Sequence, residues 1–335
     1  MMPDSATTPS YLAMIESGEF ALRESRARQL LSNCTLCPRR CGANRNNVER
    51  GFCGAGNFLE IAWAGPHFGE EPPLIGTKGA GTIFFTHCSL RCCFCQNYQI
   101  SQQGMGRFVS EEALSEIMLD LQYKGCHNIN LVTSSHYLPF ILKAIRLAAD
   151  RGLKVPLVYN SSGYETVDTL RLVEGIVDIY LPDWKYGEER IAREYSNAVD
   201  YPCVCLAAIT EMYRQVGNLQ VDNEGIAQRG IIVRHLVLPH HLANTELILS
   251  LLVENFSPSI KISLMSQYAP AYQAPMHPPL DRNLLPHEHQ EALQMMEACA
   301  FDEYWVQELE SNQLYLPDFS KMRPFPGGYE GSNAV

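Results

Sequence analysis

From residue 81 onward, segments with the apolar pattern of buried strands alternate with segments whose apolar residues have helical spacing. Six short segments are apolar on both faces, as in parallel strands buried on both sides: 82–87, 129–133, 156–160, 176–182, 230–239 and 261–268. Helices are predicted between them over 110–124, 138–150 and 164–174, the first two from apolar residues at helical spacing. The alternation predicts an α/β fold, either a partial (β/α)6 barrel or a doubly wound sheet.

The residues before this core predict an N-terminal extension over 1–78. It holds a helical segment over 9–32 that is broken near Gly18, then a cysteine-rich loop, then a strand over 58–64. The glycine- and proline-rich residues 65–82 are predicted to form a loop.

The core itself is assigned to residues 79–270. Its longest connection, 186–229, is predicted to insert one or two helices. Residues 271–335 are expected to form a C-terminal extension that packs on the core.

Charge and composition narrow the classes of function. The 335 residues include 26 Lys and Arg against 37 Asp and Glu, a formal net charge of −11. Such a chain lacks a general attraction to phosphate backbones, so we expect no nucleic-acid partner. No apolar run reaches the length of a membrane span and no secretory signal is visible. We therefore expect a cytoplasmic protein without membrane contact.

Cysteine usage points to metal or redox chemistry. Of the 12 cysteines, eight lie between Cys34 and Cys95, a clustering that in a reducing compartment favours metal binding. Cys88, Cys92 and Cys95 form a C-x3-C-x2-C motif directly after the first core strand. A [4Fe–4S] cluster normally takes four thiolates, so three ligands leave one iron open. The alternative is a zinc site with His87 as fourth ligand. Cys93 is expected to point into the fold.

This motif resembles that of the radical S-adenosylmethionine (SAM) superfamily, including the aromatic Phe94 before its last cysteine. The stretch THCSLRCCFCQNYQIS resembles the cluster loop of the pyruvate formate-lyase activating enzymes and their uncharacterised relatives. Asp183-x-Lys185 and the run RHLVLP from Arg234 also resemble these enzymes, over residues 80–270. The N-terminal CTLCPRRCGANR is similar to a sub-group of the relatives.

The resemblance implies a partial (β/α)6 radical SAM barrel and a specific reaction. A reduced [4Fe–4S] cluster cleaves SAM to a 5′-deoxyadenosyl radical, which abstracts hydrogen from a substrate. By likeness to the activating enzymes, that substrate is a protein or peptide, and the electron comes from a donor such as flavodoxin or ferredoxin. The alternatives are a radical SAM enzyme acting on a small molecule and a non-catalytic metal or iron–sulfur scaffold.

Candidate SAM-binding residues follow or end the predicted strands. They are Phe94, Asn160, Asp183, Lys185 and Arg234. Phe94 can stack on the adenine. Asp183 and Lys185 are two residues apart and point the same way, towards the ribose and the carboxylate of SAM; a surface ion pair is the alternative. Arg234 lies inside an apolar strand and needs a buried partner.

Two polar segments are less easily assigned. Activating enzymes carry a Gly-Gly-Glu turn after the second strand, where this chain has residues 133–136, Thr-Ser-Ser-His. Hydroxyls and carbonyls there can still accept from the SAM ammonium, while His136 is expected to be exposed at a helix start. His67, Glu70 and Glu71 are expected in a solvated acidic loop, with a substrate mouth as the alternative.

The N-terminal loop holds a second group of cysteines. Cys34, Cys37, Cys41 and Cys53 supply four thiols, enough to close a tetrahedral site. A structural zinc and a second iron–sulfur cluster both fit this spacing. Unligated thiols are the alternative.

Overall fold

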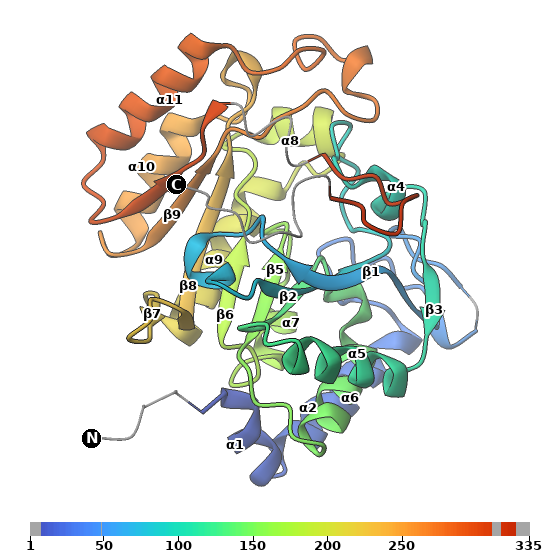
Figure 1. Ribbon diagram of the computed structural model, residues 1–335. Coiled ribbons are helices and arrows are strands. Elements are labelled where there is room, and N and C mark those ends of the chain that lie inside the picture. Colours follow the sequence, from blue (N-terminus) through green and yellow to red (C-terminus); the bar gives the residue numbers. More distant parts are fainter. Residues whose placement is uncertain (1–7, 48, 310–315, 326–335) are drawn as a thin grey trace.

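A computed structural model of the protein describes residues 8–47, 49–309 and 316–325 (Figure 1). The strands are β1 (Leu59–His67), β2 (Ala80–Phe85), β3 (Arg107–Val109), β4 (Ile129–Val132), β5 (Leu157–Ser161), β6 (Ile179–Pro182), β7 (Gln220–Val221), β8 (Ala227–Leu236), β9 (Lys261–Met265) and β10 (Tyr304–Val306). The α-helices are α1 (Ser10–Glu16), α2 (Glu19–Gln29), α3 (Pro72–Ile75), α4 (Tyr98–Ser101), α5 (Glu111–Tyr123), α6 (Leu138–Ala149), α7 (Val167–Leu172), α8 (Glu189–Ser196), α9 (Tyr201–Val216), α10 (Thr245–Asn255) and α11 (Pro286–Ala298).

The strands form one mixed ten-stranded sheet in the order β10-β9-β8-β6-β5-β4-β2-β1-β3, with β7 paired to β8. The six predicted core strands are β2, β4, β5, β6, β8 and β9, and they are parallel neighbours in chain order. This order runs in one direction, without the reversal that defines a doubly wound sheet. The mixed α/β class is therefore confirmed. Outside the six core strands, the sequence predicted β1 over 58–64 and missed β3, β7 and β10.

Alternate residues of the parallel strands point to opposite faces of the sheet. One set, including Leu131, Tyr159 and Ile231, joins the large core cluster with residues of α5 and α6. The other set, including Leu181 and Ile232, packs against the fully buried Leu74 of α3. The crossover helices and the α3 segment thus cover opposite faces.

Residues 65–82 correct the prediction of a loop. β1 continues to His67 and pairs antiparallel with β2, and the short α3 follows it. α3 begins with Pro72 and Pro73, which suit the first helical turn because no amide hydrogen is needed there. Proline therefore marks a helix start here.

Several local predictions are confirmed. The Ser110 hydroxyl accepts from the Ala113 amide at 3.1 Å and caps α5. Gly18, at φ 78°, separates α1 from α2. The insertion 186–229 holds α8 and α9. α7 is shorter than the predicted helix over 164–174.

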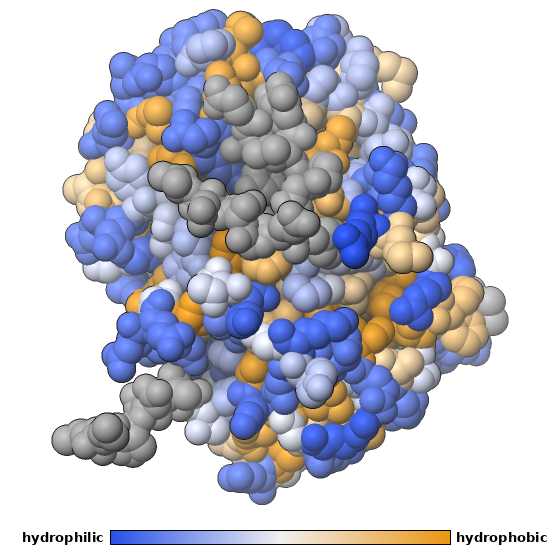
Figure 2. All heavy atoms as spheres, viewed as in Figure 1, coloured by the Kyte–Doolittle hydropathy of each residue, from blue (hydrophilic) through white to orange (hydrophobic). Residues whose placement is uncertain are grey.

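The outer surface mixes hydrophilic and hydrophobic residues. Figure 2 shows small groups of hydrophobic residues spread among hydrophilic ones on the face viewed. No helix in the described ranges is both long enough and apolar enough to cross a membrane.

Candidate functional site

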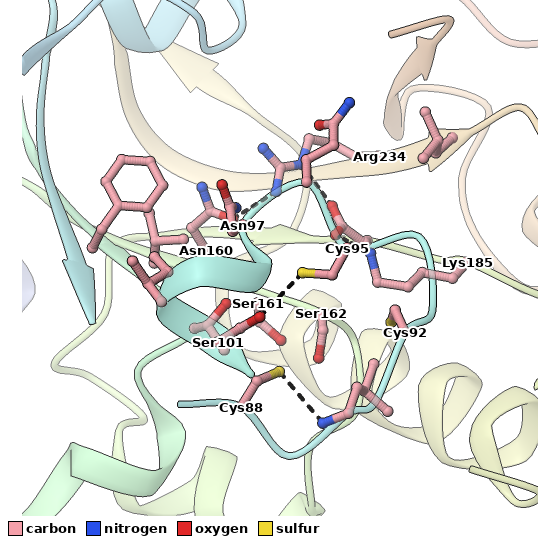
Figure 3. Close-up of a pocket in the computed structure, with 18 of the residues that line it drawn as sticks. Cys88, Cys92, Cys95, Asn97, Ser101, Asn160, Ser161, Ser162, Lys185 and Arg234 are labelled. Atoms are coloured by element: carbon pink, nitrogen blue, oxygen red, sulfur yellow. Dashed lines mark hydrogen bonds and ion pairs between the residues drawn. The ribbon is translucent and has the colours of Figure 1, made fainter. Parts of the chain in front are cut away.

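The residues singled out in the sequence line one pocket at the carboxyl ends of the parallel strands (Figure 3). They are Cys88, Cys92, Phe94, Cys95, Asn160, Asp183, Lys185 and Arg234. The cysteines follow β2, Asn160 ends β5, the Asp-x-Lys pair follows β6, and Arg234 lies in β8. Four separate segments therefore meet at the edge where parallel α/β folds place their ligands.

The cluster loop (residues 88–95) bends around the pocket, and each of its three pocket-lining sulfurs contacts a polar group. The Leu90 amide donates to Cys88 Sγ at 3.4 Å, the Ser196 hydroxyl donates to Cys92 Sγ at 2.8 Å, and the Ser101 hydroxyl lies 3.2 Å from Cys95 Sγ. Burial, and then the Cys92 thiol, raise the pKa of Cys95 to about 11. Burial also raises the pKa of Cys92, and the nearby Lys185 ammonium opposes it. Metal binding here has to displace thiol protons.

The remaining residues of this loop have different surroundings. Cys93 is 5% exposed and is not part of the pocket lining, as expected. Phe94 lines the pocket and packs edge-on against Tyr186 and Tyr268, with ring centroids 6.3 and 5.8 Å away. Its ring is therefore held in place by other aromatic residues.

No zinc-type ligand set is assembled at the pocket. Across the described ranges, no group of three or more His, Cys, Asp and Glu side chains could hold a metal ion. His87 Nε2 lies 3.4 Å from Glu60 Oε2, an ion-pair distance without a well-formed hydrogen bond. Burial, ahead of other effects, lowers the pKa of His87. A four-iron cluster binds each thiolate on a different iron, so its ligands surround a volume and do not converge on one ion.

A network of four charged side chains lines the same pocket as the cysteines. Arg234 Nε donates to Asp183 Oδ1 at 2.8 Å, Nη1 to Glu70 Oε2 at 3.0 Å, and Nη2 to Asn160 Oδ1 at 2.6 Å. Lys185 Nζ donates to the other Asp183 oxygen at 2.7 Å. The Asp183 and Lys185 side chains are only 16% and 17% exposed, so the surface ion-pair alternative is wrong.

The charges in this network perturb one another. Burial raises the pKa of Asp183, but the Arg234 and Lys185 cations outweigh it and the net shift is downward. For Glu70, burial outweighs Arg234 and the Asn130 amide, so its pKa is raised. Burial, helped by Arg234, lowers the pKa of His67 to about 4, so His67 is neutral at neutral pH.

Glu70 is the main site residue that the sequence analysis misplaced. His67 and Glu71 are each 7% exposed and the Glu70 side chain is 6% exposed, so the solvated acidic loop is wrong. The missed signal is Asn130, whose amide lies inside an apolar strand and needs a buried partner. It donates to Glu70 Oε1 at 2.8 Å.

The turn after β4 also differs from expectation. His136 is 1% exposed, not at the surface, and its Nε2 lies 2.8 Å from the Thr86 carbonyl oxygen. Burial lowers its pKa to about 3. Ser135 donates to Glu165 at 3.0 Å, whereas Thr133, at φ 52°, lines the pocket.

The N-terminal cysteine loop packs directly against the cluster loop. Arg39 Nε donates to the Ser89 carbonyl at 2.8 Å, and Arg91 Nη2 donates to the Phe52 carbonyl at 2.5 Å. Both guanidinium groups lie over the Phe52 ring, at 4.0 and 5.0 Å from its centroid. These contacts fix one loop on the other.

The four N-terminal thiols differ in exposure. Cys34, Cys37 and Cys53 are buried and Cys41 is exposed. Burial, with a smaller effect of Cys34 and Cys41, raises the pKa of Cys53. Burial is also the main cause that raises the pKa of Cys37 to about 12. Like the pocket cysteines, these described thiols do not form a group of three or more side chains that could hold a metal ion in this structure, so a metal at this loop stays a prediction.

No protein-family profile matches the chain. Its sequence is similar to a Methanocaldococcus jannaschii protein described as uncharacterized protein MJ0674, with 30% identity over 285 residues. The alignment covers 82% of this chain and 78% of the archaeal protein. The similarity therefore extends well beyond the pocket-forming segments.

Proposed function

This chain belongs to the same family as the M. jannaschii protein, and we propose that it is a radical SAM iron–sulfur enzyme. The observation that carries the proposal is that three cysteines of one loop share a pocket with Asp183, Lys185 and Arg234. No other cysteine belongs to the described lining of that pocket, which fits a cluster with one iron left for SAM. We assign the six parallel strands to a partial (β/α)6 barrel, because their order is sequential and their helices share one face.

The bound cofactors supply the redox chemistry. Cys88, Cys92 and Cys95 would hold a [4Fe–4S] cluster, which would supply the electron for reductive cleavage of SAM and so for hydrogen abstraction from a substrate. The protein has to orient SAM and exclude water from the radical.

Lys185 and Asp183 are assigned to SAM binding. The Lys185 ammonium contributes to the pKa of Cys92, so it lies near the cluster loop, where it can pair with the SAM carboxylate. Asp183 is held ionised by Arg234 and Lys185 and can accept from ribose hydroxyls. Phe94 offers an aromatic surface for the adenine.

Arg234 is assigned to positioning. Three of its donor atoms already bond to Asp183, Glu70 and Asn160. It fixes their orientation and compensates two buried carboxylates. Asn160 shares the pocket and is held by the same guanidinium.

We propose a protein or peptide substrate, as in the activating enzymes, with flavodoxin or ferredoxin as electron donor. The aromatic residues Phe84 and Phe325 in the pocket lining support an apolar polypeptide contact. Action on a small molecule is the second candidate, because the pocket also contains charged groups suited to polar ligands.

The proposal is tested by product analysis of the anaerobically reconstituted, dithionite-reduced protein. We expect wild type to convert SAM to methionine and 5′-deoxyadenosine, and Cys92→Ala to lose that activity because an iron ligand is removed. Cys93→Ala is the matched control, since its thiol is next in sequence but outside the pocket, and should retain most activity. Full activity of Cys92→Ala rejects the assignment.

A further inference from the structure

A segment near the C-terminus lies against the mouth of the pocket. We call residues 316–325 the C-terminal strap; Figure 1 shows it in dark red beside α4. Its residue Phe325 is 9% exposed and lines the same pocket as the three cysteines of the cluster loop. Part of the pocket wall is thus formed by this segment.

The strap is seated in an apolar groove. The groove consists of Trp63 and His67 of β1, Phe84 of β2, Ile100 of α4 and Val132 of β4. The Phe325 ring lies 5.5 Å from Trp63, 4.3 Å from His67 and 5.3 Å from Phe84, centroid to centroid. Phe319 adds an edge contact to Phe84 at 5.5 Å. Two aromatic side chains of one segment therefore fill one groove.

One polar side chain of α4 joins the strap to the rest of the protein. Gln99 Oε1 accepts from the Phe319 amide at 2.8 Å, and Gln99 Nε2 donates to Asp318 Oδ1 at 3.3 Å. Within the strap, the Asp318 amide donates to the Pro324 carbonyl at 2.8 Å and the Ser320 hydroxyl donates to Asp318 at 2.6 Å. The strap is therefore held by hydrogen bonds within itself. Its phenylalanine rings contact the groove, and Gln99 of α4 binds its residues 318 and 319.

We propose that this groove is the docking site for the peptide substrate, and that the strap occupies it until a peptide with large aromatic or aliphatic side chains displaces it. The groove holds a segment of polypeptide in this structure, which shows that its shape and chemistry suit one. It is continuous with the pocket, so a docked peptide reaches the cysteine side. The peptide supplies the rings, a backbone amide that donates to Gln99 Oε1 and an oxygen that accepts from Gln99 Nε2, as the strap does at rest.

Competition between the strap and a free peptide sets the apparent affinity of the groove for that peptide. A tethered segment acts at an effective concentration on the order of millimolar, so a free peptide binds weakly until the strap is loosened. Each aromatic contact contributes about 0.5–1.5 kcal/mol beyond its buried area, so removal of both strap rings shifts the competition at least about tenfold.

The test is peptide binding to the full-length protein. The probe is a labelled, terminally blocked peptide with the sequence of residues 316–325, LPDFSKMRPF, followed by fluorescence anisotropy. We expect Phe319→Ala/Phe325→Ala to bind it at least about tenfold more tightly than wild type. Met322→Ala is the matched control, because Met322 is in the strap but 92% exposed, and it should bind as wild type does. A probe with both phenylalanines replaced by alanine should not bind.

Two results overturn the proposal. One is that the probe binds the double variant as weakly as it binds wild type. The other is that the probe with both phenylalanines replaced by alanine binds the double variant as tightly as the original probe does. Phe325→Ala alone, which removes one strap ring and leaves every groove residue and Gln99 in place, checks the same point if the double variant does not fold; it should also bind the probe more tightly than wild type, and unchanged binding counts against the proposal. The docking proposal rests on the proposed function, but binding of the probe peptide is measured without SAM. Loss of peptide binding with intact SAM cleavage therefore rejects only the docking site, and the reverse result rejects only the chemistry.

Discussion

Glu70 links three strands through its two carboxylate oxygens. Oε1 accepts from Asn130 of β4 at 2.8 Å and from Asn160 of β5 at 3.4 Å, and Oε2 accepts from Arg234 of β8. A buried guanidinium is costly when it loses a carboxylate partner. Glu70 therefore holds both the charge balance and the shape of the pocket.

Glu70→Gln should destabilise the protein by about 1–3 kcal/mol at pH 8, because Arg234 loses a charged acceptor. The measurement is urea unfolding of the full chain. Glu116→Gln is the matched control: its carboxylate, 61% exposed, pairs with Arg151 at the surface, and its loss should destabilise the protein much less than Glu70→Gln does. Equal changes in the free energy of unfolding for the two substitutions would show that the buried network stabilises the protein no more than a surface ion pair does.

Lys185→Ala should weaken SAM binding while the cluster still assembles. A charge-assisted hydrogen bond of about 1.5–3 kcal/mol corresponds to ~10–150-fold in affinity. Equilibrium dialysis of SAM against the reconstituted protein measures the change, with iron content determined in parallel. An unchanged affinity would remove Lys185 from the SAM site.

Glu165 predicts a pH dependence of stability. The residue is 3% exposed, and burial is the main cause that raises its pKa to about 7. The folded state therefore binds this proton more tightly than the unfolded state. The resulting stability is complete below about pH 4.5 and is lost as pH rises through 7, a change of about 3 kcal/mol. Urea unfolding from pH 4.5 to 8 should show that this part of the decline is absent in Glu165→Gln. A parallel decline in both proteins would contradict the assignment.

At the scale of elements, the two cysteine-rich loops form a unit. Phe52 of the N-terminal loop lies under Arg39 and Arg91, and the Arg91 side chain comes from the cluster loop. The four N-terminal thiols lie in a segment that precedes the sheet and contributes no residue to the pocket lining. A closed structural site suits that position better than a redox centre that exchanges electrons with a substrate.

We therefore expect about one zinc and no iron per chain in a full-length protein whose Cys88, Cys92 and Cys95 are all alanine. The measurement is metal analysis after purification and again after anaerobic reconstitution with iron and sulfide. About four irons with sulfide would instead establish a second [4Fe–4S] cluster at this loop. Absence of any metal would leave Cys34, Cys37, Cys41 and Cys53 as free thiols.

The core elements could be predicted from sequence because their residues carry the local signals. The six parallel strands are apolar on both faces, and α5 has a serine cap and a glycine just beyond its end. β1 past residue 64 and the edge strand β10 could not be predicted, because strand pairing is decided by partners distant in sequence. The buried position of Glu70 depends on Asn130 and Arg234, which lie 60 and 164 residues away.

At the scale of the whole molecule, sequential parallel strands bring the pocket together. β2, β5, β6 and β8 each deliver one part of it at their carboxyl ends, and the residues after β2 supply the three cysteines. These residues could be identified from the sequence, because each motif is defined by spacing between residues that are close in the chain. The C-terminal strap carries no such motif, and only the folded chain places residues 325 and 88 in the lining of one pocket.

The central claim is that one pocket holds a cluster and SAM together. The most direct measurement is low-temperature electron paramagnetic resonance of the reconstituted, reduced protein with and without SAM. We predict an iron–sulfur signal that changes when SAM is added, because an iron without a cysteine ligand would be free to bind SAM. A signal that stays the same at saturating SAM, or its persistence in a Cys88, Cys92 and Cys95 triple alanine variant, would contradict the account.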